Sequence, residues 1–259
     1  NHFALPTATW SNNGEGITDL PATPAAGSHA SSKTYVDAAI AAALGDAGMT
    51  KLLVHDLSPA TSSGGYVTLT GWQDAAYKSY VIDIIGVNSS LDNYALGFQI
   101  QTGGSTWHTG TSDYEGAWVC SGGGSGNDGT QEITMAGNKS GTHGWASPNL
   151  ENNSATGTLR EKYSATSQLI LPNNHSGAAW YKKVVAKAQV PYARTFNGSS
   201  NDVPGPGGVG AANLQSSTIF SANTATITGI RFSLWGSWTA GPSGVISAGA
   251  KFIIYGRTY

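Results

Sequence analysis

From residue 50 to its end, the chain alternates short runs of β-branched and aromatic residues with clusters of glycine, serine and asparagine. Runs of this length, bounded by turn residues, are typical of β-strands. No long stretch with a helical period interrupts them. The pattern therefore predicts a mainly β fold, a jelly-roll-like antiparallel β-sandwich, and argues against a parallel α/β sheet. The clearest predicted strands are 52–55, 66–70, 80–87, 94–101, 117–120, 132–135, 168–171, 180–189, 217–220, 224–235 and 251–255.

Two of these runs, 80–85 and 230–235, alternate strictly between two faces, which is the period of a half-buried strand. One face of these runs carries Tyr80, Ile82, Ile84, Ile230, Phe232 and Leu234, and the other carries Val81, Asp83, Ile85, Arg231, Ser233 and Trp235. Several connections exceed ordinary hairpin length, and such loops are usually functional or mobile. These predicted loops are 102–116, 121–130, 137–166 and 197–214.

The first 30 residues predict an extended arm in front of the β domain. Pro6, Pro21 and Pro24 lie among glycine, serine, threonine and alanine, a composition that resists both helix and central strand. The arm also carries more apolar side chains than a free linker usually holds. They are Phe3, Leu5, Trp10, Ile17 and Leu20. We expect this arm, residues 1–30, to dock on a partner.

Residues 31–48 contain the strong helix signal of the chain. Alanine supplies helix propensity, Asp37 falls in the first turn and Gly45 suits the C-terminal stop. A helix of about three turns is marginal alone in water, so it must pack against something. It either docks on its own β domain, residues 49–259, or bundles with identical helices on a symmetry axis, and we favour the bundle. Its apolar stripe and flank are Tyr35, Val36, Ile40, Ala43 and Leu44.

Charge and cysteine content exclude several classes of protein. Charged residues make up 11% of the chain and its formal net charge is −2, so no strong field draws it to nucleic acid or to anionic lipid. Cys120 is a single cysteine and cannot form an internal disulfide, which suits folding in a reducing cytosol. No stretch approaches the roughly 20 apolar residues of a membrane span, so we expect no membrane insertion.

The sequence carries no recognised catalytic or metal-binding motif. His-x-x-x-His, Cys-x-x-Cys and Gly-x-Ser-x-Gly are all missing, so we expect no zinc site, no cofactor and no serine hydrolase triad. Glycoside cleavage would need two converging carboxyl groups, such as Asp113 with Glu115 or Asp128 with Glu132. We favour solvated loop charges at these positions and predict a protein that is not an enzyme.

Aromatic residues in or beside the predicted loops are the candidate binding residues. An amphipathic ring next to polar donors can stack on a sugar face, and such rings are favoured at recognition surfaces. The alternative is that the rings fill the core or a subunit interface, which we favour, above all for Trp118. The candidates are Trp107, Tyr114, Trp118 and Trp145.

Two parts of the sequence resemble fibre and spike proteins of tailed phages. Segment 33–40, Lys-Thr-Tyr-Val-Asp-Ala-Ala-Ile, is similar to the Lys-x-Tyr-Val-Asp helix that commonly precedes fibre domains. The β region is similar to a fibre head that closes with a strand, a Ser/Gly turn, a strand and Tyr-Gly. The segments that carry this likeness are 80–84, 107–114, 227–232, 244–249 and 251–256. The resemblance covers 33–45 and 66–256, whereas 137–166 and 203–208 depart from the pattern.

This resemblance implies a structural protein of a phage virion, assembled in the bacterial cytoplasm. It implies a homotrimer that attaches to other virion proteins through residues 1–30 and presents its β head outward, where the head contacts a host-surface glycan. Tail fibre, tail spike and head fibre all fit. A capsid-decorating protein without a receptor role and a polysaccharide-degrading tail spike remain the alternative functions.

Overall fold

The computed structural model describes residues 48–91, 94–124, 131–150, 164–172, 182–193, 210–220, 225–236 and 241–258. The described strands all belong to one unit, Met49–Tyr259. The predicted arm at 1–30 lies outside the described residues, and so does the predicted helix at 31–48 except for its last residue. Both remain predictions.

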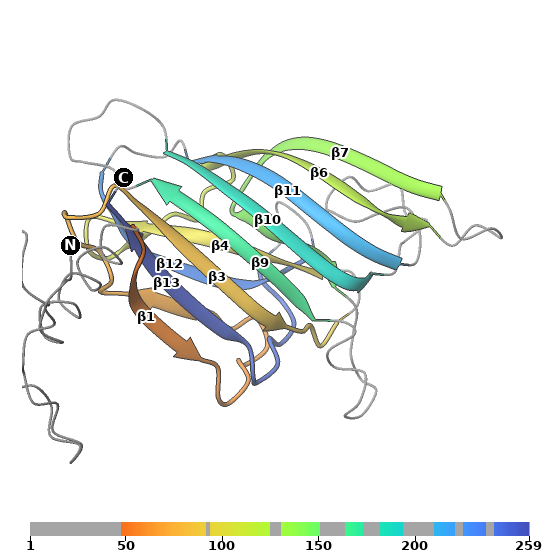
Figure 1. Cartoon of the computed structure of the whole chain (residues 1–259), viewed down its shortest axis with the longest axis horizontal. Helices are drawn as coiled ribbons and strands as arrows, with labels where there is room; N and C mark the ends of the chain where they lie inside the picture. Colours follow the sequence, from red (N-terminus) through yellow and green to blue (C-terminus); the bar gives the residue numbers. More distant parts are fainter. Residues whose placement is uncertain are drawn as a thin grey trace, which may run out of the picture. The chain divides into compact units, whose positions relative to one another are not determined.

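Two antiparallel sheets pack together (Figure 1). The larger has eight strands in the order β1 (Thr50–Asp56), β13 (Lys251–Arg257), β3 (Ser79–Val87), β9 (Ala165–Pro172), β10 (Lys182–Ala193), β11 (Gly210–Phe220), β6 (Tyr114–Gly124) and β7 (Gln131–Gly141). The smaller has five strands, with the order β2 (Val67–Thr70), β12 (Ile227–Trp235), β4 (Tyr94–Thr102) and β5 (Thr106–Trp107), and with β8 (Gly144–Leu150) also paired to β4. The mainly β antiparallel sandwich is confirmed.

Strands from the two ends of the unit are neighbours in both sheets. The first strand, β1, pairs with the last, β13, in the larger sheet, and β2 pairs with β12 in the smaller one. Both pairs join residues nearly the whole length of the domain apart, so the fold is closed by non-local pairing. The jelly-roll connectivity itself remains a prediction.

The core lies between the sheets and follows the two-residue period of the strands. In β3 the face with Tyr80, Ile82 and Ile84 is buried, whereas Ile85 on the other face is 44% exposed. Full burial of one aliphatic side chain stabilises a fold by roughly 1.5–3 kcal/mol, and alternate positions of most strands contribute in this way. Val81 departs from the pattern, because it points away from the core cluster and is still fully buried.

In β12 the face with Ile230, Phe232 and Leu234 is buried, and most of the opposite face is buried as well, although a half-buried strand was predicted. Ser233 and Trp235 are both fully buried, and only Arg231 keeps partial exposure. The Trp235 ring stacks on His143, and Tyr66 meets it edge-on. Residues outside the sheet therefore cover the end of this face, which a period-two pattern cannot reveal.

Several predicted loops are wrong, because strands extend into them. Segment 102–116 contains β5 and the start of β6, and 121–130 begins with the end of β6. Segment 137–166 contains the end of β7 and all of β8, and 197–214 ends in the first residues of β11. These stretches are rich in glycine, serine and threonine and have no apolar alternation, so only the pairing of neighbouring strands defines them as β structure.

Candidate binding groove

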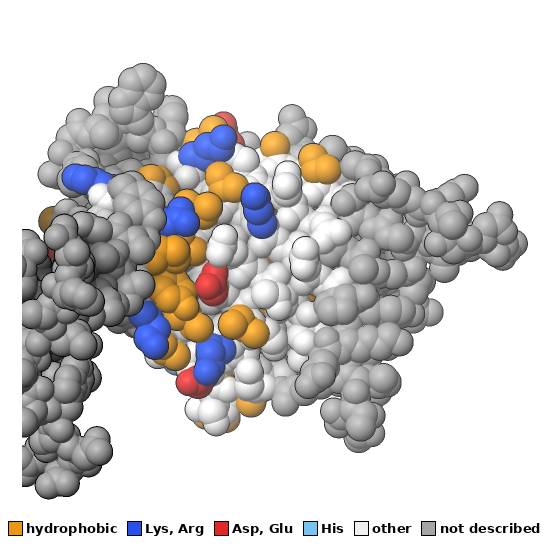
Figure 2. Space-filling model, viewed as in Figure 1, with side chains coloured by type: hydrophobic (Ala, Val, Ile, Leu, Met, Phe, Trp, Pro, Cys, Tyr) orange, Lys and Arg blue, Asp and Glu red, His pale blue; other side chains and the backbone are white. Residues whose placement is uncertain are grey.

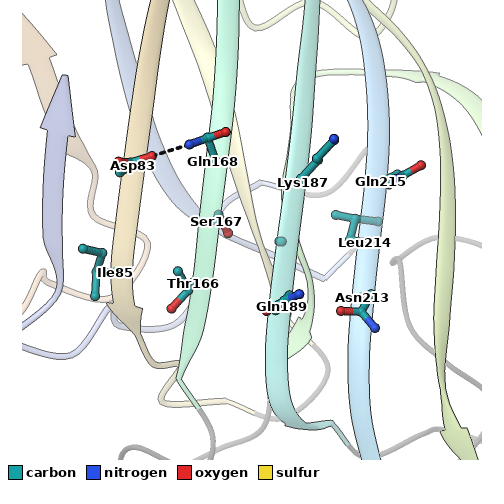
Figure 3. Close-up of a pocket in the computed structure, with 11 residues that line it drawn as sticks. Asp83, Ile85, Thr166, Ser167, Gln168, Lys187, Gln189, Asn213, Leu214 and Gln215 are labelled. Atoms are coloured by element: carbon teal, nitrogen blue, oxygen red, sulfur yellow. Dashed lines mark hydrogen bonds between the residues drawn. The ribbon is translucent and has the colours of Figure 1, made fainter. Parts of the chain in front are cut away.

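A groove of about 560 Å³ crosses the outer face of the larger sheet over β3, β9, β10 and β11 (Figure 3). Most of the side chains that line it point away from the core. The polar ones among them are Asp83, Thr166, Gln168, Lys187, Gln189, Asn213 and Gln215. β9, β10 and β11 follow one another in the chain, whereas β3 is distant in sequence, so the groove is completed by the pairing of β3 with β9.

Strand register aligns the polar side chains in rows across the sheet. Asp83 is opposite Gln168, Gln168 is opposite Lys187, and Lys187 is opposite Gln215. We call these four residues the polar row. Gln168 Nε2 donates a hydrogen bond to Asp83 Oδ1 at 2.9 Å. A second row two positions along the strands contains Thr166, and the groove therefore presents mostly neutral donors and acceptors with one carboxylate and one ammonium.

An apolar row lies beside the polar row, two positions along the strands in the other direction. Tyr255 is opposite Val81, Val81 is opposite Ile170, and Ile170 is opposite Val185. Tyr255, Ile170 and Val185 are each half-buried. Val81, in the middle of this row, is fully buried, and none of the four residues lines the groove. The apolar side chain that does line the groove is Ile85, which is 44% exposed.

The charged side chains of this outer face are mostly cationic. They are Lys51, Lys183, Lys187, Lys251 and Arg257 against Asp56, Asp83 and Glu115. Lys251 Nζ forms an exposed ion pair with Asp56 Oδ1 at 3.1 Å. Figure 2 shows hydrophobic side chains gathered over β13 and β3 with lysine and arginine around them. Within the described residues, the face is thus amphipathic with a cationic rim.

Three of the aromatic candidates are core residues. Tyr114 and Trp145 are fully buried and Trp118 is 2% exposed. This corrects their place among the candidate glycan-binding residues, because a ring without exposed surface cannot reach a ligand, and it agrees with the core interpretation that was favoured for these rings. Tyr114 Oη instead accepts a hydrogen bond from Ile100 N at 2.7 Å, and burial strongly raises its pKa. Trp107 alone among the candidates is partly exposed.

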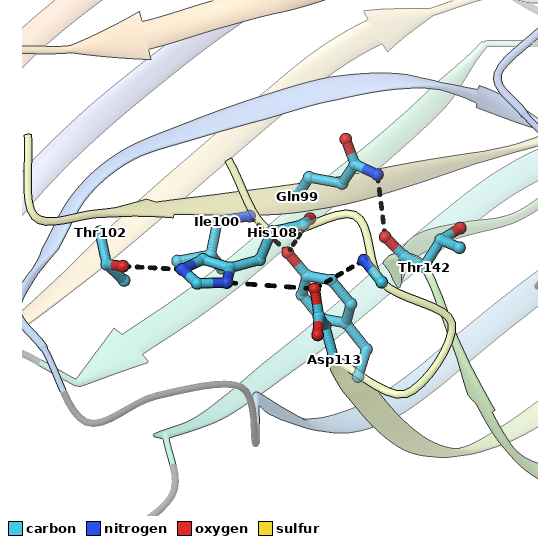
Figure 4. A network of polar contacts seen from close by, with 8 residues as sticks. Gln99, Ile100, Thr102, His108, Asp113 and Thr142 are labelled. Atoms are coloured by element: carbon cyan, nitrogen blue, oxygen red, sulfur yellow. Dashed lines mark hydrogen bonds and ion pairs between the residues drawn. The ribbon is translucent and has the colours of Figure 1, made fainter. Parts of the chain in front are cut away.

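The carboxyl pair Asp113 and Glu115 does not converge on a cleft. Asp113 Oδ2 accepts a hydrogen bond from Gly110 N at 2.6 Å within its own loop, whereas Glu115 is exposed on the outer face of β6. Thr102, His108 and Asp113 do follow the hydroxyl, imidazole and carboxylate order of a triad (Figure 4). Thr102 is only 1% exposed and His108 Nδ1 is 4.0 Å from Asp113 Oδ2, so the network fixes the loop and offers no accessible nucleophile.

The second carboxyl pair, Asp128 with Glu132, falls where side chains lie outside the described residues. Across the described ranges, no cluster of histidine, cysteine and acidic side chains has the composition to hold a metal ion. In the same part of the chain, no helix is long and apolar enough to cross a membrane.

No family model, no curated protein and no solved structure matches the chain. The polar row was missed by sequence reasoning, although part of its signal was present. The alternation in 165–172 and 183–190 marks Gln168 and Lys187 as outward-facing. What the sequence did not reveal is that β3, β9, β10 and β11 are neighbours.

Proposed function

We propose that the chain is a non-enzymatic structural protein of a tailed-phage particle whose β-sandwich head binds a surface polysaccharide in the groove over β3, β9, β10 and β11. The observation that carries this proposal is the polar row in the groove, together with the exposed apolar side chain of Ile85 in the same groove. A pyranose ring has hydroxyl groups at its edge and C–H groups on its faces, so it matches a surface with amides on one side and apolar side chains on the other. Ile85 supplies exposed apolar surface inside the groove.

The groove also favours binding over cleavage. Its one carboxylate, Asp83, already accepts a hydrogen bond from Gln168, and no second carboxyl group belongs to the residues that line it. Glycoside hydrolysis generally uses two carboxyl groups at a fixed separation. A polysaccharide-degrading spike is therefore the less favoured function.

The particle-associated role rests on the resemblance of 33–40 and of the β region to phage fibre proteins, together with the surface of the larger sheet. The outer face carries several large exposed apolar side chains, spread over β1, β3, β11 and β6: Val54, Ile85, Ile219 and Val119 are each at least 36% exposed. Apolar groups gathered on one face are typical of interaction surfaces. We propose a homotrimer in the virion, formed through the helix at 31–48 and attached through the arm at 1–30.

The proposal is tested by binding of the full chain to an array of bacterial surface polysaccharides, with Lys187→Ala as the variant. Lys187 lies in the polar row, and Lys183→Ala is the matched control because Lys183 is an exposed lysine four residues earlier on β10, outside the groove. We expect Lys187→Ala to weaken binding roughly tenfold, as loss of one charged hydrogen bond would, and Lys183→Ala to leave it unchanged.

If Lys187→Ala and Lys183→Ala lose the same amount of polysaccharide affinity, the polysaccharide is attracted to the cationic face in general, and the groove is excluded as the binding site. If no polysaccharide binds the unmodified chain, the capsid-decorating function without a receptor becomes the better account. Release of reducing ends from a bound polysaccharide would instead indicate a degrading spike.

A further inference from the structure

The outer face of the smaller sheet holds an arginine against two aromatic rings. Arg231 on β12 lies with its Cζ 3.9 Å from the centroid of the Tyr66 ring and 4.6 Å from that of Trp107. All three side chains are half-buried. Cation–π contacts of this kind are worth about 0.5–1 kcal/mol when exposed and more when water is excluded. The rings therefore hold the guanidinium at the surface in a defined place.

Two consecutive hydrogen bonds, through the buried side chain of Gln99, also fix the Arg231 side chain. Arg231 Nε donates to Gln99 Oε1 at 2.9 Å, and Gln99 Nε2 donates to the carbonyl oxygen of Thr142 at 2.8 Å (Figure 4 shows the Gln99–Thr142 bond). Gln99 is 2% exposed and is the direct cross-strand partner of Arg231. The amide is oriented by the backbone, and it in turn orients the guanidinium.

The turn that carries Trp107 is equally well defined. β5 pairs with the end of β4, with Thr102 opposite Thr106, and the residues between them make a tight turn. Gly103 and Gly104 have φ values of 61° and 90°, in the left-handed region where glycine is strongly favoured. The ring of Trp107 is thus placed by the hairpin and needs no ligand to order it.

Hydrogen bonds behind Trp107 hold this hairpin on the sheet. His108 N donates to the carbonyl oxygen of Ile100 at 3.1 Å, and the His108 ring Nε2 lies 2.7 Å from Thr102 Oγ1. Tyr114 Oη donates to the carbonyl oxygen of His108 at 3.2 Å. A binding wall that is fixed before the ligand arrives loses little entropy on binding.

Arg231 has no acidic partner among the described residues. The ion pairs found there join His108 to Asp113 and Lys251 to Asp56. A guanidinium has five N–H groups, and Nε alone uses one here, so both terminal nitrogens keep their donors. Burial lowers the pKa of Arg231, with the hydroxyls of Tyr66 and Tyr114 acting in the opposite direction. A partly desolvated cation is normally paired, and this one lacks its counter-ion.

We propose that Arg231, Tyr66 and Trp107 form a binding site for the carboxylate of an acidic sugar, a uronate-type pyranose. The two terminal guanidinium nitrogens match a planar carboxylate in a bidentate arrangement, and the aromatic rings offer apolar surface to the sugar ring. Thr68, exposed and directly opposite Arg231 on β2, adds a hydroxyl at the same face. The site extends the proposed polysaccharide function but lies on the other sheet and does not depend on the groove.

The test uses ligand-observed NMR on the full chain with methyl glucuronide as the probe. Methyl glucoside, which lacks the carboxylate, and inorganic phosphate are the comparison probes. We expect methyl glucuronide to bind and both comparison probes to bind at least roughly tenfold more weakly. Methyl glucoside lacks the charge-assisted bidentate pair, whereas phosphate keeps such a pair with the guanidinium but has no C–H face for the aromatic rings.

Arg231→Lys keeps the charge and removes the bidentate donors, so we expect it to weaken glucuronide binding at least roughly tenfold. Arg257→Lys is the matched control on the larger sheet and should bind like the unmodified chain. Trp107→Leu, a change at the partly exposed hairpin, gives a second variant if Arg231→Lys does not fold, and it should also weaken binding.

The proposal is overturned if glucuronide fails to bind, if phosphate binds as well as glucuronide, or if the Arg231 and Trp107 variants bind it unchanged. Lys187→Ala separates this result from the groove: it should leave glucuronide binding at Arg231 intact. If only Lys187→Ala loses glucuronide binding, the carboxylate binds in the groove and not at Arg231.

Discussion

His143 is a histidine enclosed by two tryptophan rings and fully buried. Its ring stacks on Trp235 with centroids 4.4 Å apart and planes 17° apart, and Trp145 meets it edge-on at 4.4 Å. Thr142 Oγ1 lies 3.1 Å from Nδ1. Burial lowers the pKa of His143 from its ordinary 6.5 to about 3, because the charged imidazolium would lose its hydration there. The imidazole is therefore neutral in the folded protein.

This burial predicts a pH-dependent loss of stability. Above pH 6.5 His143 is neutral in both states, whereas between pH 6.5 and about 3 only the unfolded chain binds the proton. The free energy of unfolding should then fall by up to about 1.4 kcal/mol per pH unit as the pH is lowered through this window. Urea denaturation of the full chain and of His143→Phe at pH 7.5, 6, 5 and 4.5 measures the difference. Parallel pH profiles for the two proteins would contradict the prediction.

At the scale of elements, β8 shows why sequence reading failed for part of the fold. Its sequence, Gly-Trp-Ala-Ser-Pro-Asn-Leu, contains glycine and proline and no apolar alternation, so it indicated a loop. It is a strand because it pairs with β4 and packs against β10 and β11. β3 and β12 were predicted well because their own side chains alternate. The polar row and the Arg231 site depend on which strands become neighbours, which local pattern does not encode.

The pairing of β8 with β4 leads to a prediction at Gly144. Gly144 is opposite Phe98, and a Cβ added to Gly144 would overlap the buried Phe98 ring. Forcing such an overlap costs about 1–3 kcal/mol, so Gly144→Ala should lower the free energy of urea unfolding by that amount. Gly241→Ala is the control, because a Cβ there meets nothing within 4 Å. Similar unfolding midpoints for the two variants would show that the β4–β8 contact is not close-packed.

At the scale of the whole molecule, both outer faces of the sandwich carry side chains that are normally covered by apolar surface or paired with an opposite charge. The larger sheet exposes Val54, Ile85 and Val119, and the smaller one holds Arg231 without an acid among the described residues. The chain carries only 11% charged residues to keep such surfaces hydrated. These properties suit a head that works within an assembly, in which neighbouring molecules or ligands cover part of its surface.

The proposed trimer is tested at the helix, away from the head. Ile40 is central to the apolar stripe predicted for 31–48, and an aspartate there would place a charge on the axis where identical helices meet. Ala38 lies about 160° round a helix from Ile40, so Ala38→Asp introduces the same charge on the opposite side.

We expect light scattering of the full chain to give a trimer for the unmodified protein and for Ala38→Asp, and a lower mass for Ile40→Asp. The urea midpoint of the β domain should be the same in all three, because its core lies between its own two sheets. If the Ile40→Asp protein stays trimeric, the helix is not the subunit contact, and the outer face of the larger sheet becomes the candidate for it. If the unmodified protein is a monomer, the proposed fibre trimer is wrong.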